Sequence, residues 1–516
     1  MAILIRGGRI FTNDAVATEF ERGDILLAGD RIVAIGADLS AEASRHPDVQ
    51  VLDASRSIVL PGFIDAHMHS NEGFEMGRYD NLPLELWLAE VYPPFGAPTL
   101  SWREHYLRAM LVGIVSIRSG VTTLQDDVIN MAFTPDAVDA TATAYRDLGL
   151  KGWITASMWD EGFLQSLPPF TSDLVDADLR KRLDALKTPG RAEQIELFHH
   201  LRTLWHGRDG MRIILGPCGP QRCSPELLED VGELSKSLDL PIHCHVLETK
   251  TQAVTGQTKY GMTLPAFLDK VGCMTHRLTM NHAIWLTDAD MDMMGSVGAS
   301  TTHNPLANLK LGSGVSPIRK LKSAGVNVAL GCDGVASADS ADIFQAIKVA
   351  AGLHKIGSHD FHTWVSAHEV YEMATRAAAR SSLMQDEVGS LEIGKKADVI
   401  LLDRYDWGFL PLHDVRNQIA FSVNSEAVKT VIADGRVVMA DRRLVRVDET
   451  ALREEISEAA ERFRRDCCPS MSVGAATVRP ALEAMHFKAT GMGVPAGHLP
   501  LRLPPAYAKA AQYPLD

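Results

Sequence analysis

The sequence predicts an α/β protein: a (β/α)8 barrel of the TIM type, with a small β-sandwich domain formed from both chain ends. Two observations predict the barrel, since apolar strand-like runs alternate with amphipathic helical patterns and eight such runs are present. A third predicts the sandwich, because short β-like segments at the start of the chain have counterparts near its end. A chain of 516 residues has room for both parts.

The two chain ends are expected to share one domain. Residues 1–57 alternate short β-like segments with turns, at 3–9, 23–27, 31–35 and 49–52. Similar segments return within residues 389–449, at 397–402 and 428–439. Because neither set is expected to be stable alone, we expect them to pair into one sandwich that a large insert interrupts.

The insert, residues 58–388, is the predicted barrel. Its eight strand-like runs are 58–69, 120–128, 151–159, 211–217, 241–248, 277–285, 299–304 and 326–333. Helical patterns lie between them at 174–186, 191–205 and 225–238. The last begins with Ser224, a good N-cap, and Pro225 at the first helical position.

Residues 450–516 are predicted to form a charged helix at 450–465 and then a tail rich in Pro, Gly and Ala. The tail after Pro469 looks poorly suited to packing on its own barrel. We expect it to be an arm over a neighbouring subunit or a partly ordered lid.

Composition and net charge disfavour several classes of function. The 51 Lys and Arg residues against 65 Asp and Glu give a net charge of −14, which disfavours binding to nucleic acid or anionic membranes. No apolar run approaches the ~20 residues of a membrane span, and residues 1–8 resemble a strand and turn rather than a signal sequence. Seven irregularly spaced cysteines indicate reduced thiols, although Cys467-Cys468 or the Cys218 to Cys223 spacing could bind metal. We therefore expect a cytoplasmic enzyme or binding protein.

Polar clusters follow the predicted strands. His67 and His69 are two residues apart on a strand, so they point to the same face and could bind one metal ion, unless they are neighbours on a solvated turn by chance. Other clusters end the later runs: His243-Cys244-His245 with Glu248, Asn281-His282, His303-Asn304 and Asp333. Each alone has an ordinary explanation, as a core histidine or a turn-capping Asp. Their recurrence at the carboxyl ends of separate strands, where barrel enzymes place their chemistry, favours a shared site.

These residues resemble the amidohydrolase superfamily, in particular the branch of cytosine, guanine and thiomethyladenosine deaminases and triazine chlorohydrolases. The resemblance covers about residues 1–450. It is strong at 61–69, at His245 with Glu248, at 303–309 and at 331–337, and residues 389–398 look like the family's return into the small β-domain.

The resemblance implies one divalent metal ion held by His67, His69, His245 and Asp333, with Glu248 and His282 facing the substrate and the reactive water. Three neutral imidazoles and one carboxylate suit zinc, or iron in a similar pocket. Such a metal lowers the pKa of bound water to roughly 7. Asp333 can then take the water's proton, and Glu248 can give a proton to the ring nitrogen beside the attacked carbon.

The site is expected to hold one metal ion. No lysine follows the fourth run at 213–218, so the carbamylated lysine of two-metal relatives such as dihydroorotase is not supported there. His243 should lie one layer deeper than His245 on the same strand face, and its role stays unassigned. His303 is expected to be a positioning residue at the substrate rather than a metal ligand.

Four further residues are candidates for the substrate pocket. Residues 81–88 resemble the family's helix beside the pocket, so Trp87 either forms a wall for a ring or is ordinary helix packing. Gln125, Trp159 and Arg222 follow the second, third and fourth runs and would face the metal. Arg222 could hold a carboxylate or an electron-rich ring edge, or cap the next helix at the surface.

The function implied is hydrolytic deamination of an amino-substituted nitrogen heterocycle of pyrimidine, purine, pterin or triazine type, with release of ammonia or an amine. Ala338 stands where the family often has Asn, which puts a familiar nucleobase in question. Dechlorination or amide hydrolysis on the same scaffold is the alternative, and a noncatalytic scaffold is a remote one because the ligands are all present. The partner is a small heterocyclic molecule, and the family's habit of association implies a homo-oligomer of two or more chains.

Overall fold

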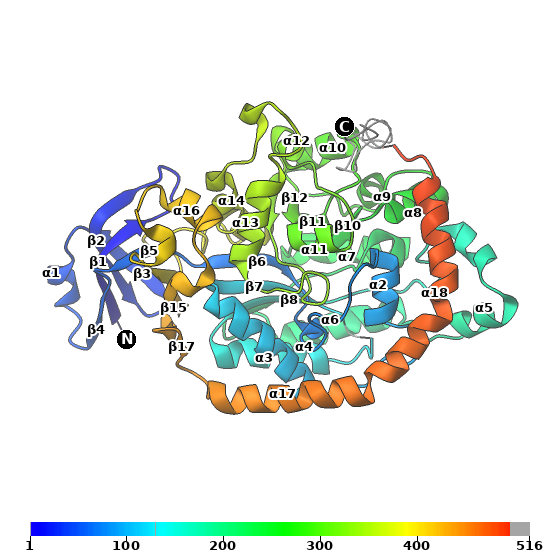
Figure 1. The fold of residues 1–516 in the computed structure, drawn as a ribbon, viewed down its shortest axis with the longest axis horizontal. Coiled ribbons are helices and arrows are strands. Elements are labelled where there is room, and N and C mark those ends of the chain that lie inside the picture. The colour runs from blue at the N-terminus through cyan, green and yellow to red at the C-terminus, as the bar shows by residue number, and fades with distance from the viewer. Residues whose placement is uncertain (1, 130, 496–516) are drawn as a thin grey trace, which may run out of the picture.

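The computed structural model describes residues 2–129 and 131–495. Its elements form one mixed sheet and two parallel sheets with helices around them. In Figure 1 the mixed sheet lies at the left, and the parallel strands lie in the centre, among the green and cyan helices. The arrangement is α/β, as the alternating pattern predicts.

Two four-stranded parallel sheets carry the strands predicted for the barrel. Their orders are β6-β7-β8-β9 and β10-β11-β12-β13. The strands are β6 (Phe63–Met68), β7 (Val121–Val128), β8 (Lys151–Ala156), β9 (Met211–Ile213), β10 (Ile242–Val246), β11 (Leu278–His282), β12 (Ser300–His303) and β13 (Asn327–Leu330). A parallel bridge between Leu215 and Ile242 joins the two sheets after β9. At the other side the N–H of Asp333, after β13, donates to the carbonyl of His67 on β6, at 2.8 Å.

Helices follow the parallel strands in the expected alternation. They are α2 (Leu84–Val91), α3 (Trp102–Arg118), α4 (Asp136–Leu148), α5 (Ala177–Asp184), α6 (Arg191–Trp205), α7 (Pro225–Leu238), α8 (Lys250–Thr255), α9 (Leu264–Lys270), α10 (Asp288–Val297), α11 (Pro305–Lys310), α12 (Ile318–Ser323), α13 (Ile343–Leu353), α14 (Ala367–Met373) and α15 (Arg376–Ser381). The predicted cap of α7 is confirmed, because Ser224 Oγ accepts the N–H of Leu227 at 3.2 Å and Pro225 opens the helix.

The first predicted barrel strand, 58–69, is two strands. β5 (Ser57–Pro61) belongs to the mixed sheet, and β6 begins after Gly62. A Cβ on Gly62 would lie 2.4 Å from the Thr122 side chain, so only glycine fits where the chain crosses between the sheets. The apolar pattern runs through both strands because both are buried, which hides the break in the sequence.

The mixed sheet pairs the two chain ends, as predicted. Its order is β17-β16-β15-β14-β5-β1-β2-β3, with β4 beside β1. Its strands are β1 (Ala2–Phe11), β2 (Glu19–Ala28), β3 (Arg31–Gly36), β4 (Val49–Asp53), β14 (Val399–Asp403), β15 (Val428–Ala433), β16 (Arg436–Ala440) and β17 (Arg443–Leu444), with short α1 (Ser40–Ala43) and α16 (Val415–Phe421) nearby in the chain. The antiparallel pair β14 and β5 joins the early and late segments.

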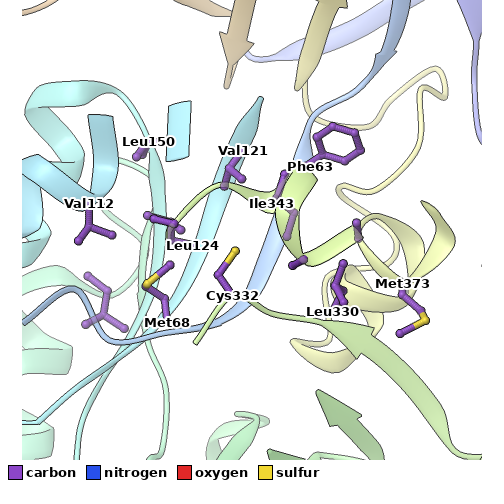
Figure 2. Close-up of a cluster of buried hydrophobic side chains, with 14 of the residues drawn as sticks. Phe63, Met68, Val112, Val121, Leu124, Leu150, Leu330, Cys332, Ile343 and Met373 are labelled. Atoms are coloured by element: carbon purple, nitrogen blue, oxygen red, sulfur yellow. The ribbon is translucent and has the colours of Figure 1, made fainter. Parts of the chain in front are cut away.

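Apolar side chains from β6, β7 and β13 meet those of the surrounding helices in the main core. Figure 2 shows this packing for the buried residues Phe63, Val121, Leu124, Leu330, Ile343 and Met373. Phe63 makes edge-to-face contacts with the rings of Phe344 and Tyr371, at 5.6 and 6.0 Å between centroids. This packing fixes the strands whose far ends carry the polar residues.

The C-terminal part departs from the prediction. The charged helix is confirmed as α17 (Glu449–Asp466), but the segment after it is a second helix, α18 (Cys468–Gly491), which lies against α2 at the right of Figure 1. Leu482 and Met485 of α18 are buried with Leu86 and Ala89 of α2, so the expectation that this segment would not pack on its own chain is wrong. Pro469 lies in the first turn of α18, where a missing N–H costs little. Residues 496–516 of the predicted tail lie outside the described residues.

All seven cysteines are free, in agreement with the prediction of reduced thiols. The two groups of side chains that could hold a metal ion in the described residues contain no cysteine. Within residues 2–129 and 131–495, no helix has the length and apolar character needed to cross a membrane.

A buried ion pair links the parallel and mixed sheets. The Lys151 ammonium on β8 donates to the carboxylate of Asp398, just before β14, and the two side chains are only 6% and 4% exposed. Asp398 also accepts the N–H of Asp434 at 2.8 Å and the hydroxyl of Thr122 at 3.2 Å. The carboxylate is therefore bonded to groups from both sheets.

We expect Lys151→Met to lower the free energy of unfolding by about 3 kcal/mol, because it leaves the buried Asp398 charge without its cation. Urea denaturation followed by circular dichroism measures the change. Lys320→Met is the matched control: its pair with Asp288 joins side chains that are 49% and 67% exposed. The control should lose less than about 1 kcal/mol. Equal losses in the two variants would contradict a linking role for the buried pair.

Candidate active site

Four histidines and one aspartate meet at the carboxyl ends of four parallel strands. His67 and His69 come from the end of β6, His245 from β10, His282 from β11 and Asp333 from the segment after β13. Two groups have ligand atoms within 4.8 Å of one another: His67 with His69 and His245, and His67 with His282 and Asp333. The structure thus brings together the residues that the motifs single out.

The distances are those of side chains that share one centre. Nε2 of His69 lies 3.2 Å from Nε2 of His245 and 3.5 Å from Oδ1 of Asp333. Nε2 of His67 lies 3.6 Å from the same carboxylate oxygen. The nitrogen atoms of three imidazoles and one carboxylate oxygen therefore face a common point.

Backbone carbonyls orient two of these histidines. Nδ1 of His69 donates to the carbonyl of Asp127 at 2.7 Å, and Nδ1 of His245 donates to the carbonyl of Cys218 at 2.8 Å. Because a carbonyl only accepts, each ring in its neutral form carries its proton on Nδ1 and presents a lone pair on Nε2. That tautomer is the one needed for metal binding through Nε2.

The third histidine has a different partner. Nδ1 of His67 lies 2.8 Å from Nε2 of His243, one layer deeper in the barrel region. Nε2 of His67 is buried and has no hydrogen-bond partner in the described part of the chain. An unsatisfied buried nitrogen aimed at two other imidazoles fits a metal ligand.

Backbone strain gathers at the same place. His282 and Asp333 have φ values of 72° and 71°, and Leu247 and Ala283 have 54° and 46°. The left-handed region is uncommon for side chains other than glycine and clusters at functional sites. Asp333 is held there by two bonds, from its own N–H to the His67 carbonyl at 2.8 Å and from the Gly334 N–H to its Oδ1 at 2.6 Å.

Glu248 and His282 lie beside this centre. Nε2 of His282 is 3.6 Å from Oε2 of Glu248 and 3.8 Å from Oδ2 of Asp333. On its other side, Nδ1 of His282 lies 2.9 Å from Oδ1 of Asn308 and 3.3 Å from Nδ2 of Asn304. Burial, together with the charges of Asp333 and Glu85, raises the pKa of Glu248 well above its usual range. A carboxyl group held in its protonated form can donate a proton.

The carboxylates around His69 make this centre suited to a cation. Burial opposes a positive charge on His69, but the charges of Glu72, Asp333 and Asp127 outweigh it and raise the pKa of His69 to about 9. The same negative charges that favour a proton on His69 would favour a metal ion at this centre.

A cavity of about 340 Å³ opens over the centre. His69, His245, His282, Asp333 and Glu248 line its floor. Its walls are mainly apolar, formed by Leu84, Trp87, Leu88, Ile129, Phe133, Trp159, Phe163, Leu167, Leu186, Leu311 and Leu482. A small polar floor under apolar walls is typical of a site for a small heterocyclic molecule.

Three of the predicted substrate residues line this cavity and two do not. Trp87, Trp159 and Arg222 are lining residues. Trp87 also shows the helix packing that was the alternative to a wall for a ring. It is 3% exposed, and its Nε1 donates to the Ala336 carbonyl. Gln125 and His303 lie outside the lining and are fully buried. Gln125 contacts His243 and Ser382, and His303 contacts His354, so their predicted place at the substrate is corrected.

Sequence reasoning missed Glu72, Glu85 and Leu482 as lining residues. Glu72 is fully buried and accepts the Tyr92 hydroxyl at 2.7 Å and the Ala336 N–H at 3.0 Å. Glu72 follows the segment 61–69 and Glu85 lies within the segment 81–88, so acidic residues near His69 and Trp87 were a usable signal. Leu482 gave none, because nothing local shows that α18 folds back over the barrel region.

The chain is similar to a known protein family and to enzymes of known name. A model of the amidohydrolase family matches residues 58–438. The 5'-deoxyadenosine deaminase of Methanosarcina mazei is 30% identical over 466 residues, covering 89% of this chain and 98% of the relative. The 5-methylthioadenosine/S-adenosylhomocysteine deaminase of Thermococcus sibiricus is 32% identical over 440 residues, covering 85% and 94%.

Solved structures agree with these relatives. An adenosine deaminase from Xanthomonas campestris with bound zinc superposes with a TM-score of 0.79 at 26% identity, covering 90% of this chain and 98% of that one. The atrazine chlorohydrolase of Arthrobacter aurescens, complexed with zinc, gives a TM-score of 0.79 at 27% identity, covering 89% and 100%.

Proposed function

The chain belongs to the amidohydrolase family, and we propose that it deaminates a purine nucleoside at a single divalent metal ion bound by His67, His69, His245 and Asp333. It is a hydrolase that acts on C–N bonds other than peptide bonds, and it deaminates an amino-substituted, purine-type nitrogen heterocycle. The observation that carries the proposal is the meeting of these four ligands beside Glu248 and His282. The noncatalytic alternative does not hold for a chain with these relatives.

The fold is of the TIM-barrel type. We propose that β6 to β13 close into a (β/α)8 barrel, an arrangement supported by the Leu215–Ile242 bridge and the bond from Asp333 N–H to the His67 carbonyl. We also propose a domain division into residues 1–57 with 389–449 as a β-sandwich, 58–388 as the barrel and 450–516 as a C-terminal part. β5 then stands at the junction, because it pairs within the mixed sheet.

The donor set fits a divalent metal ion. Three imidazole nitrogens and a carboxylate oxygen are the ligands that zinc prefers, and iron is accepted by similar sets. His69 and His245 are already held in the metal-binding tautomer, and Nε2 of His67 has no other partner in the described residues. We propose zinc as the native ion, with one ion per chain.

The residues of the chain divide the proton transfers between them. When bound, the metal lowers the pKa of a water to about 7 and so makes a nucleophile available at neutral pH. Asp333 accepts the proton of the attacking water, and Glu248, held protonated by burial, donates a proton to the ring nitrogen beside the attacked carbon. His282, whose Nε2 lies 3.6 Å from Glu248 and 3.8 Å from Asp333, hydrogen-bonds the attacking water.

The cavity lining combines apolar and charged groups that suit a nucleoside. Phe163, Leu167 and Leu482 line it as apolar groups, and Glu161 and Lys187 line it as charged groups. The relatives named above are deaminases of 5'-deoxyadenosine and of 5-methylthioadenosine/S-adenosylhomocysteine. We propose that Trp87 and Trp159 contact the ring system and that Arg222 contributes a polar contact.

Hydrolytic dechlorination remains the second candidate, because the fold is shared with the atrazine chlorohydrolase. The two reactions differ only in the leaving group. An assay that measures ammonia from purine nucleosides and chloride from a chlorotriazine in parallel separates them, and ammonia release is expected.

We further propose that the protein acts in the cytoplasm as a homo-oligomer of two or more chains. Seven free cysteines support a reducing compartment. Val473 and Phe487, on α18, are 70% and 73% exposed, and we propose that they contact a second copy. Light scattering at micromolar concentration should give at least twice the chain mass of 56.3 kDa, and a monomer would contradict the oligomer.

Protein prepared without chelator should contain about one equivalent of zinc or iron by elemental analysis, because one set of four ligands converges. His245→Ala should lose most of that metal, whereas His368→Ala, which removes an exposed imidazole outside the site, should keep it. Two tightly held ions in the wild type, or full activity without metal, would contradict the assignment.

Glu248→Gln should keep its metal and lose at least about a hundredfold in turnover, because the amide preserves shape but cannot transfer a proton. Asp333→Asn should impair both metal binding and turnover. Glu233→Gln on the exposed side of α7 is the matched control and should behave as wild type. Ammonia release from 5'-deoxyadenosine measures turnover. Near-normal turnover of Glu248→Gln with its metal in place would contradict the role of Glu248 as proton donor.

A further inference from the structure

A buried chain of polar side chains runs inward from the proposed metal ligand His67. Nδ1 of His67 lies 2.8 Å from Nε2 of His243, and Nδ1 of His243 lies 2.6 Å from the amide of Gln125. The other end of that amide contacts the hydroxyl of Ser382. His67, His243 and Gln125 are fully buried and Ser382 is 4% exposed, so water does not compete for these bonds. We call these four residues the buried polar chain.

Only two hydrogen-bond directions satisfy the buried polar chain. In the outward direction, the Ser382 hydroxyl donates to Gln125, the Gln125 amide donates to His243 Nδ1, and His243 donates from Nε2 to His67 Nδ1. In the inward direction each of these bonds is reversed. The structure places the amide in the outward orientation, with Nε2 toward His243 Nδ1 and Oε1 accepting from Ser382, and a 180° rotation exchanges the two atoms and leaves both contacts in place. The two directions therefore differ in which atom of each hydrogen bond is the donor, and not in where the side chains lie.

The two directions have opposite consequences for His67. A metal-binding imidazole is neutral and carries one N–H. In the outward direction His67 accepts at Nδ1, so its proton is on Nε2, where Oδ1 of Asp333 is 3.6 Å away and no hydrogen-bond partner lies in the described residues. In the inward direction the proton is on Nδ1, and Nε2 presents a lone pair. Only the inward direction leaves His67 able to bind metal through Nε2.

We propose that His243 and Gln125 are positioning residues that fix the metal-binding tautomer of His67, with the Gln125 oxygen accepting from His243 Nδ1 and its nitrogen donating to Ser382. This inference rests on the proposed metal site. His243 does for His67 what backbone carbonyls do for His69 and His245. A side chain is needed there because the neighbour of His67 Nδ1 is the deeper histidine of β10 rather than a carbonyl.

Two substitutions at Gln125 separate polarity from packing. Gln125→Glu keeps the size and supplies only acceptors, so it imposes the inward direction. Gln125→Leu keeps most of the volume and imposes no direction. We expect Gln125→Glu to retain zinc affinity within about threefold of wild type and Gln125→Leu to weaken it by about 10- to 100-fold, measured by competition with a chromophoric chelator. Gln194→Leu is the control. It removes a buried amide that donates to the Trp159 carbonyl and does not belong to the buried polar chain, so zinc affinity should be unchanged.

Equal weakening in Gln125→Glu and Gln125→Leu would show a structural role only and overturn the proposal, as would unchanged affinity in both. Neutron diffraction from the zinc-loaded wild type tests it without any substitution. Deuterium should lie on Nδ1 of both His67 and His243, and deuterium on Nε2 of His243 would overturn the assigned direction. A wild type that binds no zinc at these histidines would overturn the metal site itself, which is a separate result.

Discussion

One carboxylate oxygen holds the first and last parallel strands in register. Oδ1 of Asp65 on β6 accepts the backbone N–H of Cys332 at 3.0 Å and that of His67 at 3.3 Å. The neighbouring bond from Asp333 N–H to the His67 carbonyl completes the link. These bonds set two proposed ligands from opposite ends of the barrel segment side by side. The distances among the other ligands depend on this register, because each comes from a strand placed relative to these two.

Burying the carboxylates and imidazoles of the site together is unfavourable in free energy. Burial opposes the charged forms of these groups, as the pKa of Asp127 shows: desolvation raises it to about 7 although the neighbouring His69 lowers it. A divalent ion would replace these conflicts with bonds. The apolar walls above then exclude water, which strengthens the charge interactions on which the proton transfers rely.

Much of the fold and of the candidate site could be predicted from the sequence, and the parts that could not have physical reasons. Strand ends carry polar residues in a period of two, so His67, His69 and His245 stand out locally, and helix caps such as Ser224 define boundaries. The break at Gly62 could not be predicted, because buried strands on both sides give one continuous apolar pattern. Gln125 was assigned to the substrate because it follows a strand, but its side chain points into the interior. Helix α18 was missed since Pro and Gly counts hide a helix stabilised by tertiary packing.

The account depends on one metal ion among four ligands, and anomalous diffraction at the zinc absorption edge tests that claim most directly. It predicts a single peak at about 2.0–2.2 Å from Nε2 of His67, His69 and His245 and from the carboxylate of Asp333. A second strong peak in the cavity, or a peak bound elsewhere with none at these four residues, would contradict it.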